Sequence, residues 1–230
     1  AHSHERPTTS QPTPGAFEQI YRQLLNEGAS GIVSLHISSK LSGTFSTAMQ
    51  TAEMLREMGV SVPIEIIDSQ QGSLGMHFGI LAAAQAAREG GDAAAVAAAA
   101  RDALARTTLY LVADDLDYLQ RGGRIGQAKR VLGTLLNVKP IISLLDGTVV
   151  ALENPRTRKR AYERIAEYVR DAAPVDEVIV GQSSQEVGDQ LEEMVRQVYD
   201  GRIRRMWAGP TIGTHVGPGA AGLALLRARV

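Results

Sequence analysis

Cysteine is absent from this 230-residue chain, and aromatic residues make up only 4% of it. Without cysteine the chain can form no disulfide bond, no thiolate nucleophile and no cysteine-ligated zinc site. A strong excess of one charge sign is also missing, because 24 lysine and arginine residues are balanced by 25 aspartate and glutamate residues. Proteins that bind nucleic acid or anionic membranes usually carry a clear basic excess. We therefore expect neither as a partner.

Long apolar runs are missing as well. The longest nearly uncharged stretch, residues 72–87, is rich in alanine and glycine and is bounded by charged residues. A membrane-spanning helix needs about 20 strongly apolar residues, so this stretch is expected to be a packed helix of a cytoplasmic protein without stable membrane insertion. No secretion signal opens the chain, and because residue 1 is alanine we expect the native N-terminus to lie upstream.

Sequence signatures of common enzymes are mostly missing. The chain has no G-x-x-x-x-G-K-[ST] phosphate loop, no G-x-G-x-x-G after a strand and no G-x-S-x-G nucleophile turn. Its five histidines show no metal-ligand spacing, so no metal site and no cofactor are expected. One enzymatic alternative stays open: Ser42 and His215, with either Asp68 or Asp114, are the side chains of a hydrolytic triad that acts on an acyl ester.

The first half of the chain alternates between strand and helix patterns. The apolar run at residues 31–37 is typical of a strand buried on both faces. A helix is expected from about Gly43, with Met49 among the residues on its inward face. A second strand and two further helices follow, and the last of them ends near residue 106. This alternation predicts a parallel sheet with covering helices.

The second half has a different character. Asp146-Gly147 separates two strand-like runs and is a strong signal for a two-residue hairpin. An amphipathic helix, a strand, another helix and a C-terminal region of short strands and glycine turns follow. We therefore predict an α/β protein with two lobes, a parallel-sheet N-terminal lobe at residues 1–106 and a mixed-sheet C-terminal lobe at residues 107–230.

Four segments rich in glycine and polar residues are candidates for ligand binding: residues 8–12, 38–44, 121–126 and 213–219. The second of them follows a buried strand, and ligands of open α/β sheets lie beyond the carboxyl ends of the strands. There Ser42 is expected to cap the next helix, while the N–H groups of Gly43 and Thr44 face an anion. Capping alone also explains this serine, a structural role explains His215, and a solvated turn explains the arginines beside the glycine pair.

Five blocks of this chain resemble, in order, those of DegV proteins. They are TTSQPTP, SSKLSGTFSTA, IIDSQQGSLGMHFGILAAAQAAREG, YLQRGGRIGQAKRVLGTLLNVKPIISLLDGTVVALENPRTRKRA and GPTIGTHVGPGAAGLAL, and they extend from about Thr8 to Leu226. The chain is therefore similar to the fatty-acid-binding subunits of bacterial fatty acid kinase. Members of this family usually begin earlier, with a strand that ends in an Asp-Ser-Thr-type motif, so the N-terminal lobe is expected to lack its native first strand.

The resemblance implies a non-catalytic, lipid-binding protein of bacterial phospholipid metabolism. It would bind one long-chain fatty acid such as palmitate, with the carboxylate between the lobes and the tail in an apolar tunnel. A separate kinase subunit would convert the bound acid to acyl phosphate with ATP, in agreement with the missing phosphate loop. Burial of each CH₂ group contributes about 0.8 kcal/mol, so a sixteen-carbon tail gains roughly 10 kcal/mol before the costs of binding.

The family's motifs assign the carboxylate ligands to individual residues. Thr9 and Ser42 match the threonine and the serine that bind the carboxylate, and His215 matches a supporting histidine. A supporting arginine matches Arg124 or, less closely, Arg121. The rest of the predicted ligand set comes from the same polar segments: Ser10, Ser39, Gly43 and Thr44.

Two further patterns lead to expectations about the tail and the partner. The small residues Gly72, Gly75, Gly79 and Ala82–Ala84 let a helix approach an acyl tail closely, but tight packing explains them equally well. Residues 154–165 carry five basic residues against one acidic residue, which suits either docking of an acidic kinase surface or a solvated helix face. The five are Arg156, Arg158, Lys159, Arg160 and Arg164.

Overall fold

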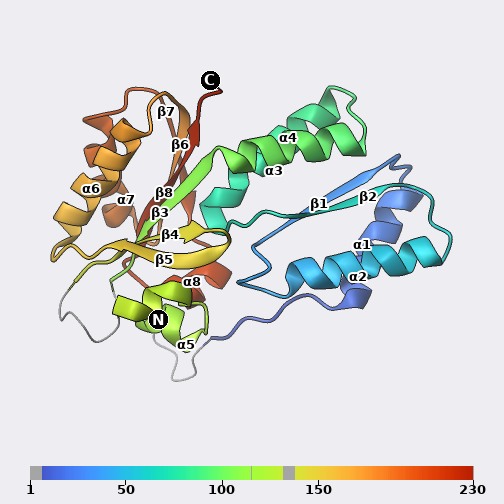
Figure 1. The fold of residues 1–230 in the computed structure, drawn as a ribbon, viewed down its shortest axis with the longest axis horizontal. Helices are drawn as coiled ribbons and strands as arrows, with labels where there is room; N and C mark the ends of the chain where they lie inside the picture. Colours follow the sequence, from blue (N-terminus) through green and yellow to red (C-terminus); the bar gives the residue numbers. More distant parts are fainter. Residues whose placement is uncertain (1–6, 115, 132–137, 230) are drawn as a thin grey trace. The chain divides into compact units, whose positions relative to one another are not determined.

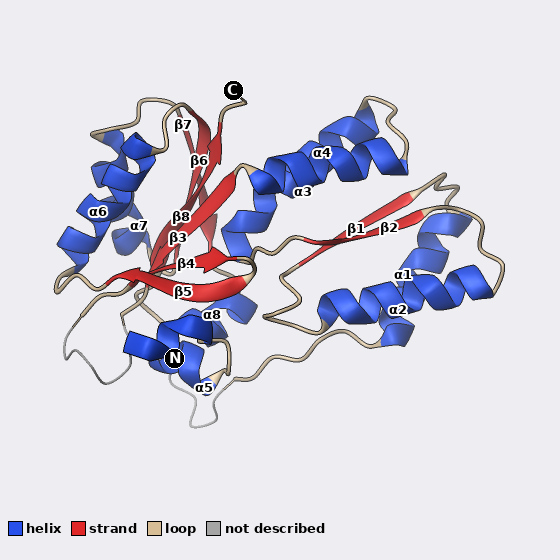
Figure 2. Cartoon of the chain, viewed as in Figure 1, coloured by secondary structure: helices blue, strands red, loops and turns tan. Residues whose placement is uncertain are grey.

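The computed structural model describes residues 7–114, 116–131 and 138–229 of the chain. These residues form two compact units, each built from helices and strands (Figures 1 and 2). The smaller unit consists of two segments, Ser10–Gly72 and Met76–Ala105. The larger unit takes up the rest of the described chain. The predicted α/β class with two lobes is confirmed, with a parallel sheet in one unit and a mixed sheet in the other.

A two-stranded parallel sheet lies at the centre of the smaller unit. Strand β1 (Ile32–His36) pairs with β2 (Ile64–Asp68), so both strands end at the same edge. Helices pack on both faces of this sheet (Figure 1), with α1 (Pro14–Asn26) and α2 (Thr44–Glu57) on one face and α3 (His77–Arg88) and α4 (Ala93–Ala105) on the other. The strands are therefore covered from both sides, as the apolar run at residues 31–37 predicts for β1.

Side chains cap the starts of two helices of the smaller unit. Thr13 caps α1, because its Oγ1 accepts a hydrogen bond from the Ala16 N–H (3.2 Å), and Pro14 takes the first helical position. Asp92 caps α4 in the same way through the Ala95 N–H (2.8 Å). Each cap satisfies a backbone donor that the first helical turn leaves unpaired.

Helix α2 differs from the prediction in the residues that face inward. Met49 is 48% exposed, so its predicted inward orientation is wrong. Two threonines, Thr47 and Thr51, take buried positions on this helix instead. The Thr51 hydroxyl donates to the Thr47 carbonyl oxygen (2.8 Å), which compensates for burying a polar group.

A six-stranded sheet forms the framework of the larger unit, in the order β5-β4-β3-β8-β6-β7. Its strands are β3 (Thr107–Val112), β4 (Ile141–Leu145), β5 (Thr148–Glu153), β6 (Val175–Gln182), β7 (Arg202–Trp207) and β8 (Ala221–Arg227). Neighbouring strands are antiparallel except for β6 and β7, which run parallel. Asp146 and Gly147 join β4 to β5 with φ values of 48° and 77°, the left-handed conformations of a two-residue hairpin, as predicted.

Two amphipathic helices, α6 (Arg158–Asp171) and α7 (Gln185–Arg196), contribute to the main core of the larger unit. Tyr162 and Ile165 of α6 and Leu191 of α7 are almost fully buried against strands β6 and β8. The last strand of the chain, β8, lies inside the sheet between β3 and β6 and contributes Leu223 and Leu225 to this core.

Short helices complete the larger unit: η1 (Ser73–Met76, which runs into the smaller unit at its last residue), α5 (Asp117–Arg121), η2 (Gly126–Val131) and α8 (Pro210–Val216). Helices α5 and α8 pack against each other. His215 lies in the last turn of α8, a helix that the predicted C-terminal region of short strands and glycine turns did not include. Only the glycines that follow α8 form a turn, which leads into β8.

A hydrogen-bonded chain of three polar side chains lies inside the smaller unit. The Tyr21 hydroxyl donates to Ser34 Oγ (2.9 Å), and Ser34 Oγ lies 2.8 Å from His36 Nε2. The Phe17 ring packs edge-on against His36, with 5.3 Å between the ring centroids. Burial lowers the pKa of His36, because water is replaced by neighbours that solvate an imidazolium poorly.

We expect this histidine to make the protein less stable as the pH falls below about 6.5. The unfolded chain protonates His36 at its ordinary pKa, whereas the folded protein does so only at lower pH, so acidification favours unfolding. Urea unfolding at about pH 7.5 and about pH 5.5 measures the loss. His36→Asn should reduce the difference without abolishing it, because burial also lowers the pKa of His215. A variant with the same pH dependence as the wild type would contradict this assignment.

Candidate functional site

Thr9 and His215 form a hydrogen-bonded pair in the larger unit. Thr9 Oγ1 lies 2.8 Å from His215 Nε2, although the two residues are 206 positions apart in the chain. Helix α8 positions the imidazole, and the polar segment near the start of the chain positions the hydroxyl. Two of the predicted carboxylate-binding residues are thus brought together.

The other ring nitrogen of His215 faces Gly122. Nδ1 is buried and has no hydrogen-bond partner among the described residues. A Cβ at position 122 would lie 2.9 Å from Cε1 of the ring and closer still to Nδ1, so only glycine leaves room for the imidazole. Burial and, secondly, the charge of Arg124 hold the pKa of His215 below its usual value. The ring is therefore neutral near pH 7.

The two candidate arginines have different surroundings. Arg124 Nη1 donates to the Gly122 carbonyl oxygen (2.6 Å), which holds the guanidinium next to the residue that packs on His215. Arg121 pairs with Asp117 (2.8 Å), and both of these side chains are more than half exposed. Of the two arginines, Arg124 is therefore the one whose charge acts on the histidine.

The glycines after α8 permit close packing within the larger unit. Gly217 (φ 74°) lies against the ring of Tyr118 in α5, and Gly219 (φ 78°) lies against the ion pair of Asp114 with Arg158. Both have left-handed backbone conformations that other residues rarely adopt. These contacts fix the segment that connects α8, and hence the histidine, to the central strand β8.

In the smaller unit, predicted ligand hydroxyls gather at the start of α2. Ser42 Oγ lies 2.7 Å from Thr44 Oγ1 and accepts a hydrogen bond from the Thr44 N–H (3.3 Å). Gly43 lies between them and is the N-cap residue of α2, so the prediction that Ser42 caps this helix is wrong. The side chain of Gln11 lies over this glycine, and its Nε2 donates to Thr47 Oγ1 (3.0 Å). The sequence prediction missed Gln11, although it adjoins the predicted ligand residues.

The loop between β1 and α2 is held by the end of β2. The N–H groups of Ser39 and Gln70 both donate to Asp68 Oδ1 (3.2 and 2.9 Å). Gln70 and Ser73 have φ values of 52° and 51°, which are uncommon outside glycine and often accompany functional sites.

The predicted ligand residues fall into two groups: Thr9, Arg121, Arg124 and His215 in the larger unit, and Ser10, Ser39, Ser42, Gly43 and Thr44 in the smaller one.

The alternative of a hydrolytic triad gains no support from this geometry. A catalytic histidine needs an aspartate on its second nitrogen, but His215 Nδ1 has no such partner within the described residues. Asp114 is bound instead by Arg158 and by Lys139 Nζ (3.0 Å), and Asp68 by two backbone N–H groups.

Metal sites and membrane-spanning helices are both absent from residues 7–114, 116–131 and 138–229. In these ranges no group of three or more His, Asp or Glu side chains is arranged to hold a metal ion. Over the same residues, no helix has both the length and the apolar character to cross a membrane.

Gly79, one of the small residues of α3, lies against a side chain of helix α4. A Cβ at this position would lie 2.7 Å from Cγ of Leu104 in α4. At Gly79, tight packing of the two helices therefore explains the glycine without an acyl tail.

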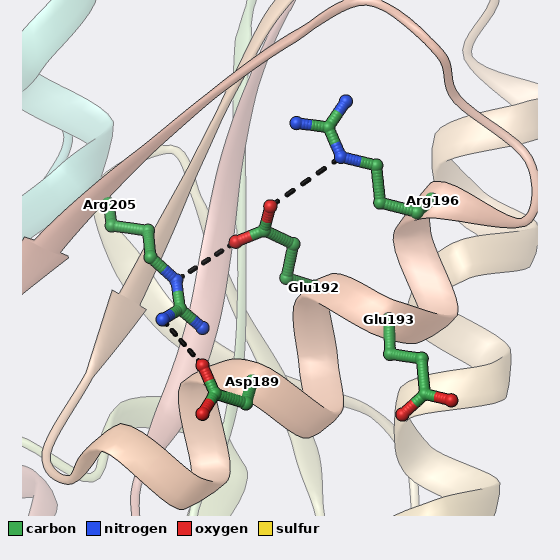
Figure 3. Close-up of a pocket in the computed structure, with 5 residues that line it drawn as sticks. All are labelled: Asp189, Glu192, Glu193, Arg196 and Arg205. Carbon is green, nitrogen blue, oxygen red and sulfur yellow. Dashed lines mark ion pairs between the residues drawn. The ribbon is translucent and has the colours of Figure 1, made fainter.

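A concave surface on α7 is built from charged side chains (Figure 3). Arg205 of β7 pairs with Asp189 (2.6 Å) and Glu192 (2.9 Å), and Arg196 pairs with Glu192 (3.5 Å). Glu193 also lines it and points away from these pairs. The arginines are thus neutralised by the protein's own carboxylates, which tie the outermost strand to its covering helix and suit an exposed sheet edge.

Comparison with known proteins agrees with this architecture. A family model described as an uncharacterised protein of the DegV family matches residues 1–228. A DegV domain-containing protein from Streptomyces coelicolor is 38% identical over 223 residues, which cover 94% of this chain and 77% of that protein.

Two solved structures are also similar. A fatty acid binding protein of the DegV family from Thermus thermophilus is 33% identical, with a TM-score of 0.85, over 96% of this chain and 79% of that one. DegV of Bacillus subtilis, a fatty acid binding protein, is 32% identical, with a TM-score of 0.82, over 96% of this chain and 78% of that one. On its sequence and its structure, the chain belongs to the DegV family.

Proposed function

We propose that this protein binds a long-chain fatty acid and holds its carboxylate without transforming it. The observation that supports this best is the Thr9–His215 pair, because a hydroxyl beside a neutral imidazole suits recognition of a carboxylate. The charge of Arg124 next to this pair favours an anion. The similarity to fatty acid binding DegV proteins from T. thermophilus and B. subtilis supports the class of ligand.

We assign the second hydroxyl ligand to Ser42 of the smaller unit. Ser42 and Thr44 lie at the start of α2, where the backbone N–H groups of the first turn and the helix dipole favour a negative charge. The proposal is that Ser42 and Thr9 bind the same carboxylate, while the acyl tail occupies an apolar tunnel. Ser10 and Ser39 are neighbours of these ligands in the same segments.

Mass spectrometry of organic extracts from the purified protein tests this function. We expect a long-chain fatty acid at a near-stoichiometric level, and its loss from a Thr9→Val/Ser42→Ala double variant. A protein that carries no fatty acid, and that hydrolyses acyl esters until Ser42 is replaced, would reverse the assignment in favour of a hydrolase.

We further propose that the protein presents the bound acid to a separate kinase subunit that forms acyl phosphate. Three of the five basic residues predicted to dock this partner are neutralised within the protein: Arg158 by Asp114, Arg160 by Glu163 and Arg164 by Glu153. Arg156 and Lys159 are exposed and form no ion pair with the described residues. These two residues are therefore the better candidates for docking an acidic surface.

Reversing both charges, with Arg156→Glu and Lys159→Glu, should slow acyl-phosphate formation with the cognate kinase subunit by about threefold to tenfold at low ionic strength. Fatty acid binding should be unchanged, and the effect should shrink in salt, because salt screens exposed charges. Arg170→Glu is the matched control, since Arg170 lies in the last turn of the same helix and pairs with the adjacent Asp171. Equal rates for wild type and double variant at low salt would exclude this surface.

A further inference from the structure

Whether Thr9 can donate a hydrogen bond to a ligand depends on the direction of its hydrogen bond with His215. If Nε2 of His215 carries the ring hydrogen, it donates to Thr9 Oγ1, and the threonine hydrogen is free for another acceptor. If Nδ1 carries the ring hydrogen, Thr9 must donate to Nε2 and has no hydrogen left for a ligand. The distance of 2.8 Å fits both arrangements.

The surroundings of Nδ1 favour the first arrangement. This nitrogen faces Gly122 and has no hydrogen-bond partner among the described residues. A hydrogen on Nδ1 would therefore be a buried donor without an acceptor, and buried N–H groups without acceptors are the rarer and costlier case. A bare lone pair at the same position is tolerated better.

The position of Arg124 supports the same tautomer. Its Nη1 is bonded to the carbonyl oxygen of Gly122 (2.6 Å), so the positive charge lies beside the residue that Nδ1 faces. A positive charge attracts a nitrogen lone pair and repels the hydrogen of an N–H group. Arg121 has no comparable effect, because it is exposed and paired with Asp117.

We propose that Gly122 and Arg124 hold His215 in the Nε2–H tautomer, so that Thr9 accepts from His215 and donates its own hydrogen to the ligand carboxylate. Arg124 is then a positioning residue, which acts on the ligand through His215 and Thr9. The role of Thr9 as a donor rests on the fatty acid binding proposed above. The tautomer itself is a property of the ligand-free protein and is tested separately.

Nitrogen-15 NMR of the ligand-free protein measures the tautomer, because protonated and unprotonated ring nitrogens resonate in well-separated ranges. The His215 signals are identified by their loss in His215→Gln. We expect a protonated Nε2 and an unprotonated Nδ1 near neutral pH. In Arg124→Gln the two tautomers should mix, and affinity for palmitate should fall about tenfold. Arg124→Lys should keep the tautomer and most of the affinity, and the matched control Arg121→Gln should change neither.

Different outcomes would contradict the tautomer assignment, the role of Arg124 and the proposed carboxylate site. A hydrogen on Nδ1 in the ligand-free wild type would overturn the tautomer assignment, even in a protein that binds palmitate. Mixing of tautomers in Arg121→Gln to the same extent as in Arg124→Gln would overturn the specific part assigned to Arg124. The expected tautomer, together with wild-type affinity in both Arg124→Gln and Thr9→Val, would instead overturn the proposed carboxylate site.

Discussion

Alanine at position 122 is expected to weaken fatty acid binding at least about tenfold while leaving the fold intact. Gly122 has φ −73° and ψ −8°, a conformation that alanine adopts without strain. Its methyl group would overlap Nδ1 and Cε1 of His215, so the ring must move and the bond from Nε2 to Thr9 is lost. Without His215, Thr9 is no longer held to donate to the carboxylate, and a hydrogen bond to a charged group contributes about 1.5–3 kcal/mol, which is the basis of this estimate. Displacement of a fluorescent fatty acid measures affinity, and thermal unfolding measures stability.

Gly213→Ala is the matched control for this substitution. Gly213 lies inside α8, two residues before His215, and a Cβ there meets no atom within 4 Å. Alanine at this position should leave affinity unchanged and raise stability by about 0.5–1 kcal/mol through its higher helix propensity. Wild-type affinity in Gly122→Ala would contradict a role for His215 in binding. Equal losses in both variants would show that α8 itself, rather than the contact at Gly122, controls affinity.

Local sequence patterns predict most of the secondary structure. The caps at Thr13 and Asp92 and the hairpin at Asp146-Gly147 depend on side chains within a few residues, so the sequence shows them directly. The burial of α2 was predicted less well. Helical periodicity identifies the apolar face of a helix but does not show how far neighbouring residues bury each position on it. Met49 lies on the predicted inward face and is nevertheless 48% exposed.

Long-range pairing explains why the end of the chain was harder to predict. Three of the seven residues of strand β8 are alanine or glycine, and the strand gains its central place only by pairing with β3 on one side and β6 on the other. The pairing of Ala221 with both Val112 and Gln182 joins positions that no local window contains. The helix at His215 was hidden for a similar reason, because its glycines also suit a turn.

The candidate site was predictable as a set of residues but not as a set of contacts. Spacing in the sequence gives no sign that Thr9 meets His215, because the contact spans 206 positions. The sequence does contain a local indication of which arginine supports the site. Asp117 precedes Arg121 by four residues, the spacing of an ion pair on a helix, so the sequence indicates that Arg121 is bound within its own helix.

Thr9→Val and Ser42→Ala should each weaken fatty acid binding by about 1.5–3 kcal/mol, roughly tenfold to a hundredfold. Each substitution removes one hydroxyl that is proposed to bind the carboxylate. The fold should survive, because Thr9 lies in a loop and Ser42 precedes a helix. Displacement of a fluorescent fatty acid measures both effects, with Ser46→Ala at an exposed position of α2 as the control. Wild-type affinity in both single variants would show that the carboxylate site is misplaced.

The double variant tests the proposal that the two hydroxyls bind one carboxylate. This test is needed because Thr9 and Ser42 belong to different units. Groups that share a ligand atom or its hydrogen-bond network are energetically coupled, whereas distant and independent groups have additive effects. We therefore expect the loss in the double variant to differ from the sum of the single losses by at least about 0.5 kcal/mol. Additive losses would mean that the hydroxyls act on separate parts of the ligand or the protein. In that case Thr9 and His215 would form the carboxylate site of the larger unit without Ser42.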